Sequence, residues 1–284
     1  MPSSQLSFTA RDGTSLAGEQ SGDGVGAEAG NAIVLLHGLT ATRRYVVMGS
    51  SVLQRAGLRV ISYDARGHGA SGPAPNPSAY TYELLAADLL ALLDTLGVER
   101  AVIAGASMGA HTTIRFALDH PERVSGLGLI TPAYDPGAST APDAYSGWDG
   151  LAQGLREGGV DGFARAQVRM HALDAVPERW RETVEKVLRQ RLAAHEHPLA
   201  VADALEAVPR SRPFESMEQV GEIAVPTIVI ASRDEADPSH PLAIAERYAT
   251  AIGGARLIVE EPGGSPMAWQ GGRVSKALAK LVDS

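Results

Sequence analysis

The sequence predicts an α/β fold with a mostly parallel, doubly wound sheet and a helical segment inserted late in the chain. Two observations support this. Short, continuously apolar runs alternate with segments of helical length, as in parallel sheets covered by helices on both faces. One of these runs, residues 101–104, passes through Gly-Ala-Ser-Met-Gly at 105–109 directly into an expected helix. Ligands of such sheets bind beyond the carboxyl ends of the strands, so residues that follow strands are the site candidates.

Composition limits the possible functions. The chain has 284 residues, 44% of them hydrophobic, enough for one large domain or a domain with an insertion. The net charge of −8 argues against nucleic acid or an anionic membrane surface as a partner, which leaves a small-molecule substrate. The absence of cysteine excludes thiol catalysis and disulfides. No leader sequence and no apolar stretch of about 18 residues is evident, so a cytoplasmic protein is expected.

The first 96 residues contain four expected strands and one long helix. Two short strands surround the Asp12-Gly13 turn signal within residues 5–20. The next two strands end in polar residues, His37-Gly38-Leu39 after strand 32–36 and the run DARGHGASG (64–72) after strand 59–63. A helix is expected over 81–96, where leucines recur on one face and Gly97 stops the helix.

The rest of the chain continues the alternation and then breaks it. After the expected helix 110–119 and strand 124–130, residues 132–222 contain helical stretches and no convincing strand. The clearest of these helices is expected from Pro177 to about His195. The sequence therefore predicts an α/β core over 1–131 and 223–284, with a helical cap over 132–222. The core resumes with the remaining expected elements: strand 226–231, helix 242–252, strand 256–260 and helix 273–282.

The segment 105–109 has the spacing of a nucleophile elbow, in which a serine sits on a very tight turn between strand and helix. Gly105 and Gly109 leave room for the crossing backbone because they lack a Cβ. Ser107 would then project from the sheet edge. The amide of Met108 would face the reacting carbonyl at a helix N-terminus.

Four ordered motifs together resemble the α/β-hydrolase fold superfamily: LLHGL (35–39), DARGHGASG (64–72), GASMG (105–109) and PTIVI…DPSHP (226–241). Their order and spacing are similar to the branch with a helical cap that holds esterases, lactonases, carbon–carbon bond hydrolases and haloperoxidases that use no cofactor. The resemblance implies that Ser107 is the nucleophile and that the amides of Leu39 and Met108 form the oxyanion hole. It implies no metal and no cofactor.

The family's catalytic acid lies in the loop after strand 226–231, which here reads SRDEADPSHP. Counting from the strand favours Asp234. The D-P-x-x-P ending favours Asp237, which we prefer. Asp135, after the preceding strand, occupies a position that some relatives use and is the third choice.

The family's catalytic histidine is missing. It normally follows the last strand in a Pro-Gly-x-Gly-His turn, but this chain reads Pro262-Gly263-Gly264-Ser265 there. A serine hydroxyl cannot accept the proton of Ser107 as an imidazole would. If the protein is a hydrolase, the predicted base is His240, displaced to the loop of the acid candidates. The triad works in several chain orders because geometry, not chain position, defines it.

Other assignments stay open at this stage. His37 and His68 are expected to brace their loops, with His37 also a candidate for the substrate pocket. Trp148, Met170 and Ser265 are the remaining pocket candidates. The leading function is a serine hydrolase acting on an ester, lactone or activated carbonyl of a small to medium apolar molecule. The alternatives are a ligand-binding member without a working triad and a lyase or isomerase that uses only the oxyanion hole.

Overall fold

A computed structural model describes residues 3–22, 32–170, 174–233 and 237–282. Its centre is an eight-stranded sheet in the order β1-β2-β4-β3-β5-β6-β7-β8. Strands β1, β2 and β4 pair antiparallel, and all other neighbouring pairs are parallel. The predicted sheet is therefore confirmed. The strands are β1 (Ser3–Thr9), β2 (Ser15–Ser21), β3 (Ala32–Leu36), β4 (Arg59–Tyr63), β5 (Ala101–Ala106), β6 (Val124–Ile130), β7 (Thr227–Ala231) and β8 (Arg256–Val259).

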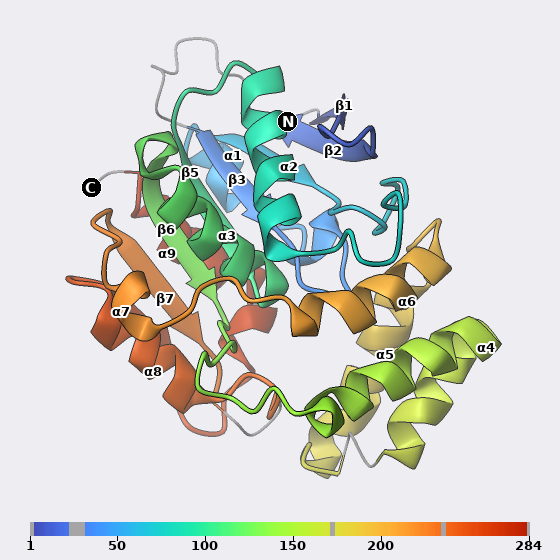
Figure 1. Cartoon of the computed structure of the whole chain (residues 1–284). Coiled ribbons are helices and arrows are strands. Elements are labelled where there is room, and N and C mark those ends of the chain that lie inside the picture. The colour runs from blue at the N-terminus through green and yellow to red at the C-terminus, as the bar shows by residue number, and fades with distance from the viewer. Residues whose placement is uncertain (1–2, 23–31, 171–173, 234–236, 283–284) are drawn as a thin grey trace.

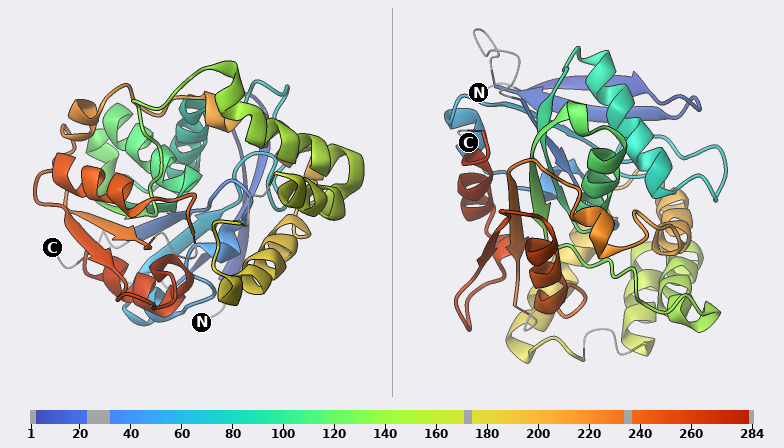
Figure 2. Two further views of the ribbon diagram at one scale, coloured as in Figure 1. Left: turned by 90° about the horizontal axis from the view of Figure 1, so that it is seen from below. Right: turned by 60° about the vertical axis from the view of Figure 1, so that its left-hand side comes forward.

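Helices cover both faces of this sheet (Figures 1 and 2). On one face, α2 (Tyr82–Thr95), α3 (Met108–Asp119) and α8 (Leu242–Ala251) share an apolar cluster with the strands. On the other face, α1 (Val52–Arg55) and α9 (Gly271–Ala279) share a second cluster. The right-hand view of Figure 2 shows α9 and α2 on opposite sides of the sheet. No helix in the described ranges is both long and apolar enough to cross a membrane.

Local signals account for the long helix of the first half. The side chain of Thr81 accepts a hydrogen bond from the amide of Leu84 at the N-terminus of α2. Leucines of α2 face the core. Gly97, with φ of 62°, follows the last turn in a conformation that a side chain would disfavour. The helix ends where the sequence predicts.

The chain between β6 and β7 is helical in its regular parts and contains α4 (Ser146–Arg169), α5 (Glu178–Leu192), α6 (Pro198–Ala207) and α7 (Met217–Val220). Short 3₁₀ turns lie at Pro142–Tyr145 (η3) and Val208–Arg210 (η4). In Figure 1, α4, α5 and α6 lie together at one end of the molecule, beyond the sheet. The predicted helix 177–195 corresponds to α5.

The sequence did not predict the bounds of α4, because glycines interrupt its helical pattern. The helix bends sharply at Gly158 and Gly159, whose backbone angles are not helical, so the two halves fold against each other. A Cβ on Gly162 would lie 2.0 Å from the carbonyl oxygen of Gly154. Gly154 and Gly162 lower the helix propensity of this segment but are needed for the close contact between its halves.

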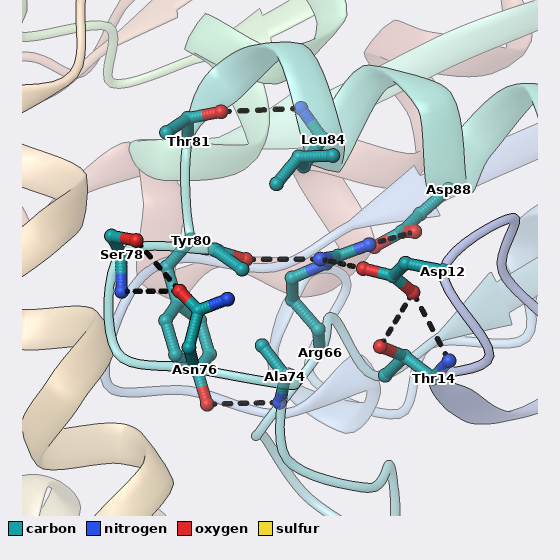
Figure 3. A network of polar contacts seen from close by, with 11 residues as sticks. Asp12, Thr14, Arg66, Ala74, Asn76, Ser78, Tyr80, Thr81, Leu84 and Asp88 are labelled. Carbon is teal, nitrogen blue, oxygen red and sulfur yellow. Dashed lines mark hydrogen bonds and ion pairs between the residues drawn. The ribbon is translucent and has the colours of Figure 1, made fainter.

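A buried ion-pair network fixes the turn that follows β4 (Figure 3). The guanidinium of Arg66 donates 2.6 and 2.8 Å hydrogen bonds to the carboxylate of Asp88 on α2 and one of 2.7 Å to Asp12 in the β1–β2 turn. Burial raises the pKa of Asp88 to about 6, although Arg66 acts in the opposite direction. The network ties the DARGHGASG turn to a helix and a hairpin that are distant in sequence.

Candidate active site

Ser107 occupies a strained turn between β5 and α3. Its φ of 52° and ψ of −114° lie outside the regions that residues with side chains prefer. Two glycines allow the crossing. A Cβ on Gly105 would lie 2.2 Å from the carbonyl carbon of Gly109, and one on Gly109 would lie 2.4 Å from the carbonyl oxygen of Leu36. This is the geometry of a nucleophile elbow, in which strain persists because the surrounding backbone determines it.

His240 lies next to Ser107. Its Nε2 is 2.9 Å from Ser107 Oγ, and its Nδ1 is 2.8 Å from Asp237 Oδ1. With Nδ1–H donating to the carboxylate, Nε2 is free to accept the proton of Ser107. Serine, imidazole and carboxylate thus form a continuous hydrogen-bonded chain. Its imidazole and its carboxylate both lie on the loop after β7.

Several groups hold Asp237 in this chain. Burial raises the pKa of its carboxyl, but the charge and hydrogen bond of His240, the Ser239 hydroxyl and the charge of Arg191 outweigh burial, so the pKa lies below its ordinary value. Ser239 Oγ donates a 2.7 Å hydrogen bond to the carboxylate. The amide of His240 donates to the carbonyl of Asp237 at 3.1 Å, which closes a tight turn between base and acid.

The other two acid candidates have different outcomes. Asp135 accepts hydrogen bonds from Arg247 and from the amide of Gly137. The Nδ1 of His240 is instead hydrogen-bonded to Asp237. The arrangement favours Asp237 over Asp135 as the predicted acid, since Nδ1 of His240 already has a carboxylate partner. Asp234 lies outside the described residues.

Two backbone amides are predicted to bind a substrate oxygen near Ser107. Met108 is the first residue of α3, where a helix leaves its amides without internal acceptors. Leu39 lies in the loop after β3, and a Cβ on its neighbour Gly38 would lie 3.4 Å from Ser107 Cβ. Neither amide has an acceptor within the described part of the chain. Amides without acceptors are the donors that an oxyanion hole requires, so the amides of Leu39 and Met108 stay the predicted pair.

His37 is buried and joins two loops, as expected for a bracing residue, and its contact with a substrate stays a prediction. It is only 2% exposed, its Nδ1–H donates to the carbonyl of Gly38 at 2.8 Å, and its Nε2 accepts from the amide of Ala65 at 2.9 Å. The cavity beside it measures about 10 Å³, at most enough for one water. Burial lowers the pKa of His37 to about 3, so the ring is a neutral brace between two loops.

His68 braces the same loops from the other side. Its two ring nitrogens lie 2.9 Å from the carbonyl oxygen of Arg66 and 2.6 Å from that of Leu39. His68 is buried beside His37, with ring centroids 5.2 Å apart. Two histidines therefore fix the loop that carries the Leu39 amide. His37 follows β3, and His68 lies in the loop after β4.

Two further histidines have structural roles that the sequence did not reveal. His111 Nε2 accepts from the amides of Ala133 and Tyr134, both at 3.0 Å, and so anchors the chain that leaves β6. His195, just after α5, accepts from the amide of Gly69 at 2.8 Å and approaches the carbonyl of Thr40 at 3.3 Å. His195 thus ties the helical segment to both loops beside the site, a contact across more than a hundred residues that no local pattern encodes.

The other pocket candidates differ in exposure and in their local contacts. Trp148 on α4 is 37% exposed. Met170, at the end of α4, packs over the first turns of the same helix, with its Sδ 2.9 Å from a Cβ placed on Gly150. Ser265 is half-buried, and its carbonyl accepts from the side chain of Gln270. All three remain predictions for substrate contact.

Glu260 occupies the strand end from which the family's histidine loop departs. It is buried, and its carboxylate accepts from the amide of Arg233 and, at 3.1 Å, from the amide of Met267. Among the described residues, no group of three or more His, Asp or Glu side chains could hold a metal ion.

The buried histidines predict acid sensitivity. Burial, the largest cause in each case, lowers the pKa values of His37, His111 and His195 to about 3. Between this value and the ordinary pKa of 6.5, the unfolded chain binds a proton at each site that the folded chain does not. The free energy of unfolding should therefore fall as pH falls below 6.5, by roughly 1.4 kcal/mol per pH unit for each ring.

Urea unfolding at pH 7.5, 6.0 and 5.0 measures this loss. In His111→Gln, the slope of stability against pH should be smaller than in the parent by one ring's share. An unchanged slope in that variant would mean that His111 is protonated in the folded protein.

Fold and site together define a class of protein. Residues 31–271 match the sequence pattern of the alpha/beta hydrolase fold, and the chain belongs to this family. It is 30% identical over 210 residues to a putative carbamate hydrolase RutD of Variovorax paradoxus, an alignment that covers 73% of this chain and 75% of that protein.

Two further similarities cover nearly the whole chain. A 2-hydroxy-6-oxononadienedioate/2-hydroxy-6-oxononatrienedioate hydrolase of Cupriavidus pinatubonensis is 29% identical over 263 residues, 91% of this chain and 86% of that protein. The crystal structure of the enol-lactonase from Burkholderia xenovorans superposes with a TM-score of 0.74 at 25% identity, over 98% of both chains. These relatives are hydrolases.

Proposed function

We propose that this protein is a serine hydrolase that cleaves an ester, lactone or related activated carbonyl in a small to medium apolar molecule. The observation that carries the proposal is the hydrogen-bonded chain from Ser107 Oγ through His240 to Asp237, with separations of 2.9 and 2.8 Å. The proposed roles are those of nucleophile, general base and orienting acid. The similar proteins support the class, because their names specify hydrolysis of a carbamate, of an oxo-dienedioate or of an enol-lactone.

The proposed reaction has two stages. His240 Nε2 accepts the proton of Ser107 as Oγ attacks the carbonyl carbon, and the amides of Leu39 and Met108 bind the oxygen that becomes negative. The imidazolium then returns the proton to the leaving oxygen, which departs and leaves an acyl group on Ser107. A water, deprotonated by His240, releases the acid and restores the serine. Asp237 keeps Nδ1 protonated and stabilises the imidazolium in both stages.

A member of the family without hydrolytic activity is the competing function. The observation that supports it is Ser265 at the position of the usual histidine. The imidazole of His240, within hydrogen-bond distance of Ser107, weakens this support, because the neighbouring loop then offers the proton acceptor that hydrolysis requires. The strained backbone at Ser107 also favours an enzyme, since strain of this kind concentrates at functional sites.

A fluorophosphonate probe tests the proposed class directly. The probe phosphonylates a serine only where a base activates it, so stoichiometric labelling of Ser107, located by peptide mass spectrometry, is expected. Labelling should disappear in Ser107→Ala and in protein unfolded with urea. A blank result with folded parent protein, alongside no hydrolysis of p-nitrophenyl esters, would favour the non-hydrolytic alternative.

We further propose that residues 132–222 act as a cap that selects the substrate. The apolar cluster that contains Leu39 and Met108 also contains residues of the helical segment, among them Leu155, Phe163 and Leu192. Leu188 on α5 packs against this cluster while remaining partly exposed. Side chains on this segment therefore adjoin the residues that would bind the oxyanion, where the acyl group of a substrate must lie.

Leu188→Ala is expected to shift the preferred acyl chain length of p-nitrophenyl esters, by about tenfold in relative kcat/KM between short and long chains, because a pocket wall discriminates each methylene by roughly 1–3 kcal/mol. Trp148→Ala and Met170→Ala, assayed with the same esters, test those two pocket predictions. An unchanged profile in all three variants would contradict the cap assignment.

A further inference from the structure

A shallow groove lies at the sheet edge formed by β8, between that strand and α9. Its volume is about 200 Å³. Ile258 and Met267 contribute apolar surface to its lining, and four cationic residues line it as well, Arg256 from the strand and Arg273, Lys276 and Lys280 from the helix. The helical cations recur at intervals of three and four residues and so share one face of α9. Arg256 and Ile258 share one face of the strand because their spacing is two.

These four cations are in no ion pair among the described residues. Within the described part of the chain, none of them forms an ion pair with a carboxylate, and the guanidinium of Arg273 hydrogen-bonds only to the neutral amide of Gln270. The chain as a whole carries a net charge of −8, and two of its three lysines are in this groove, the third being Lys186. A concentration of unpaired positive charge in an acidic protein calls for an anionic partner.

The groove is separate from the site of Ser107. In the sheet, β8 lies three places from β5, whose carboxyl end leads into Ser107. The strand β8 pairs only with β7 and so is an edge strand. The face that β8 presents to α9 is half-buried, which leaves Ile258 in part accessible to a partner.

The spacing of the charges indicates what kind of anion fits. Arg273 and Lys280 are seven residues apart on α9, or roughly 10 Å along the helix axis. Positive charges spread over this length match successive carboxylates of an extended or helical peptide, whereas a single phosphate needs cations that converge on one point. Apolar residues between the cations suit a segment that alternates acidic and apolar side chains.

A second copy of the chain is a poor occupant. In a two-fold symmetric interface each groove would face its own equivalent, so that four cations would meet four cations. Long nucleic acid is also disfavoured, because the net charge of −8 repels a polyanion beyond the groove itself.

We infer that the β8–α9 groove is a docking surface for an acidic, amphipathic polypeptide segment of a partner protein. The carboxylates of that segment would pair with Arg256, Arg273, Lys276 and Lys280, and its apolar side chains would cover Ile258 and Met267. The inference does not depend on the reaction at Ser107.

The probe is a fluorescein-labelled decapeptide of alternating glutamate and leucine, followed by fluorescence anisotropy at low and physiological salt. The parent protein should bind it, and binding should weaken as salt rises because the charges are exposed. Lys276→Glu should raise Kd at least about tenfold, and Lys276→Gln should raise it less. Ester hydrolysis and the thermal midpoint should stay at parental values in both variants.

Lys186→Glu on α5 is the matched control, since it makes the same exchange at the remaining lysine, which is exposed on a helix. Equal loss of binding in Lys186→Glu and Lys276→Glu would show that only net charge matters and would overturn the proposal. Absence of peptide binding by the folded parent would overturn it too. So would tighter binding of phosphatidylglycerol vesicles or duplex DNA than of the peptide.

Discussion

Replacing Ser107 with alanine is expected to lower kcat/KM for an ester substrate by at least about a thousandfold while leaving the fold intact. The variant loses the atom that would attack the carbonyl, and only the amides of Leu39 and Met108 would continue to stabilise the transition state. Removing the nucleophile of such a chain leaves a residual rate several orders of magnitude below the parent. Steady-state hydrolysis of p-nitrophenyl acetate at saturating and limiting concentrations measures both kcat and KM.

The control for this variant is its stability. Ser107 has a φ of 52° that alanine tolerates no better than serine, and the Ser107 amide still donates to the carbonyl of Ile130. We therefore expect an unfolding midpoint close to that of the parent. A variant that retained activity within tenfold of the parent would contradict the nucleophile assignment.

The second large effect is expected for His240. His240→Gln keeps a polar side chain of similar reach but cannot accept and hold the proton of Ser107, so kcat should fall at least a hundredfold with little change in KM. Fluorophosphonate labelling of Ser107 should slow in parallel, because the same imidazole activates the serine toward the probe. Turnover at the parental rate would exclude His240 as the base.

Ser265→His restores a histidine at the position that the family normally uses and is measured beside His240→Gln. Since the loop after β7 already supplies an imidazole 2.9 Å from Ser107, we expect Ser265→His to bring no gain in the parental background. A gain in Ser265→His, with no loss in His240→Gln, would mean that the natural protein is not built for hydrolysis.

The sequence predicted most of the sheet because its strands are continuously apolar, a pattern that burial on both faces produces. It predicted helical stretches within 132–222 but not the bounds of α4, whose glycines oppose helix propensity. Among these, Gly154 and Gly162 are explained by their close approach. The end of α2 could be read from Gly97 since a helix stop is a local property. The fold was therefore predictable where local preference and burial agree.

The candidate site divides in the same way. Ser107 could be found because the elbow is a local motif with steric requirements. The hydrogen bonds of His195 with Gly69, and of His111 with the chain after β6, join segments that are distant in sequence. No local sequence pattern indicates them. The choice between Asp237 and Asp135 likewise required the direction of the His240 ring, which only tertiary structure provides.

The turn from Asp237 to His240 makes two members of the candidate triad neighbours within four residues. Two hydrogen bonds join these residues. The His240 amide donates to the carbonyl of Asp237 at 3.1 Å, and Nδ1 of the ring lies 2.8 Å from the Asp237 carboxylate. The pairing of acid and base is thus built into one segment and is independent of how neighbouring strands are arranged. To complete the candidate triad, the assembled domain must then maintain the distance from Nε2 to Ser107 Oγ. Mild heating or denaturant that displaces this segment would move acid and base together. Activity should therefore be lost before the sheet itself unfolds.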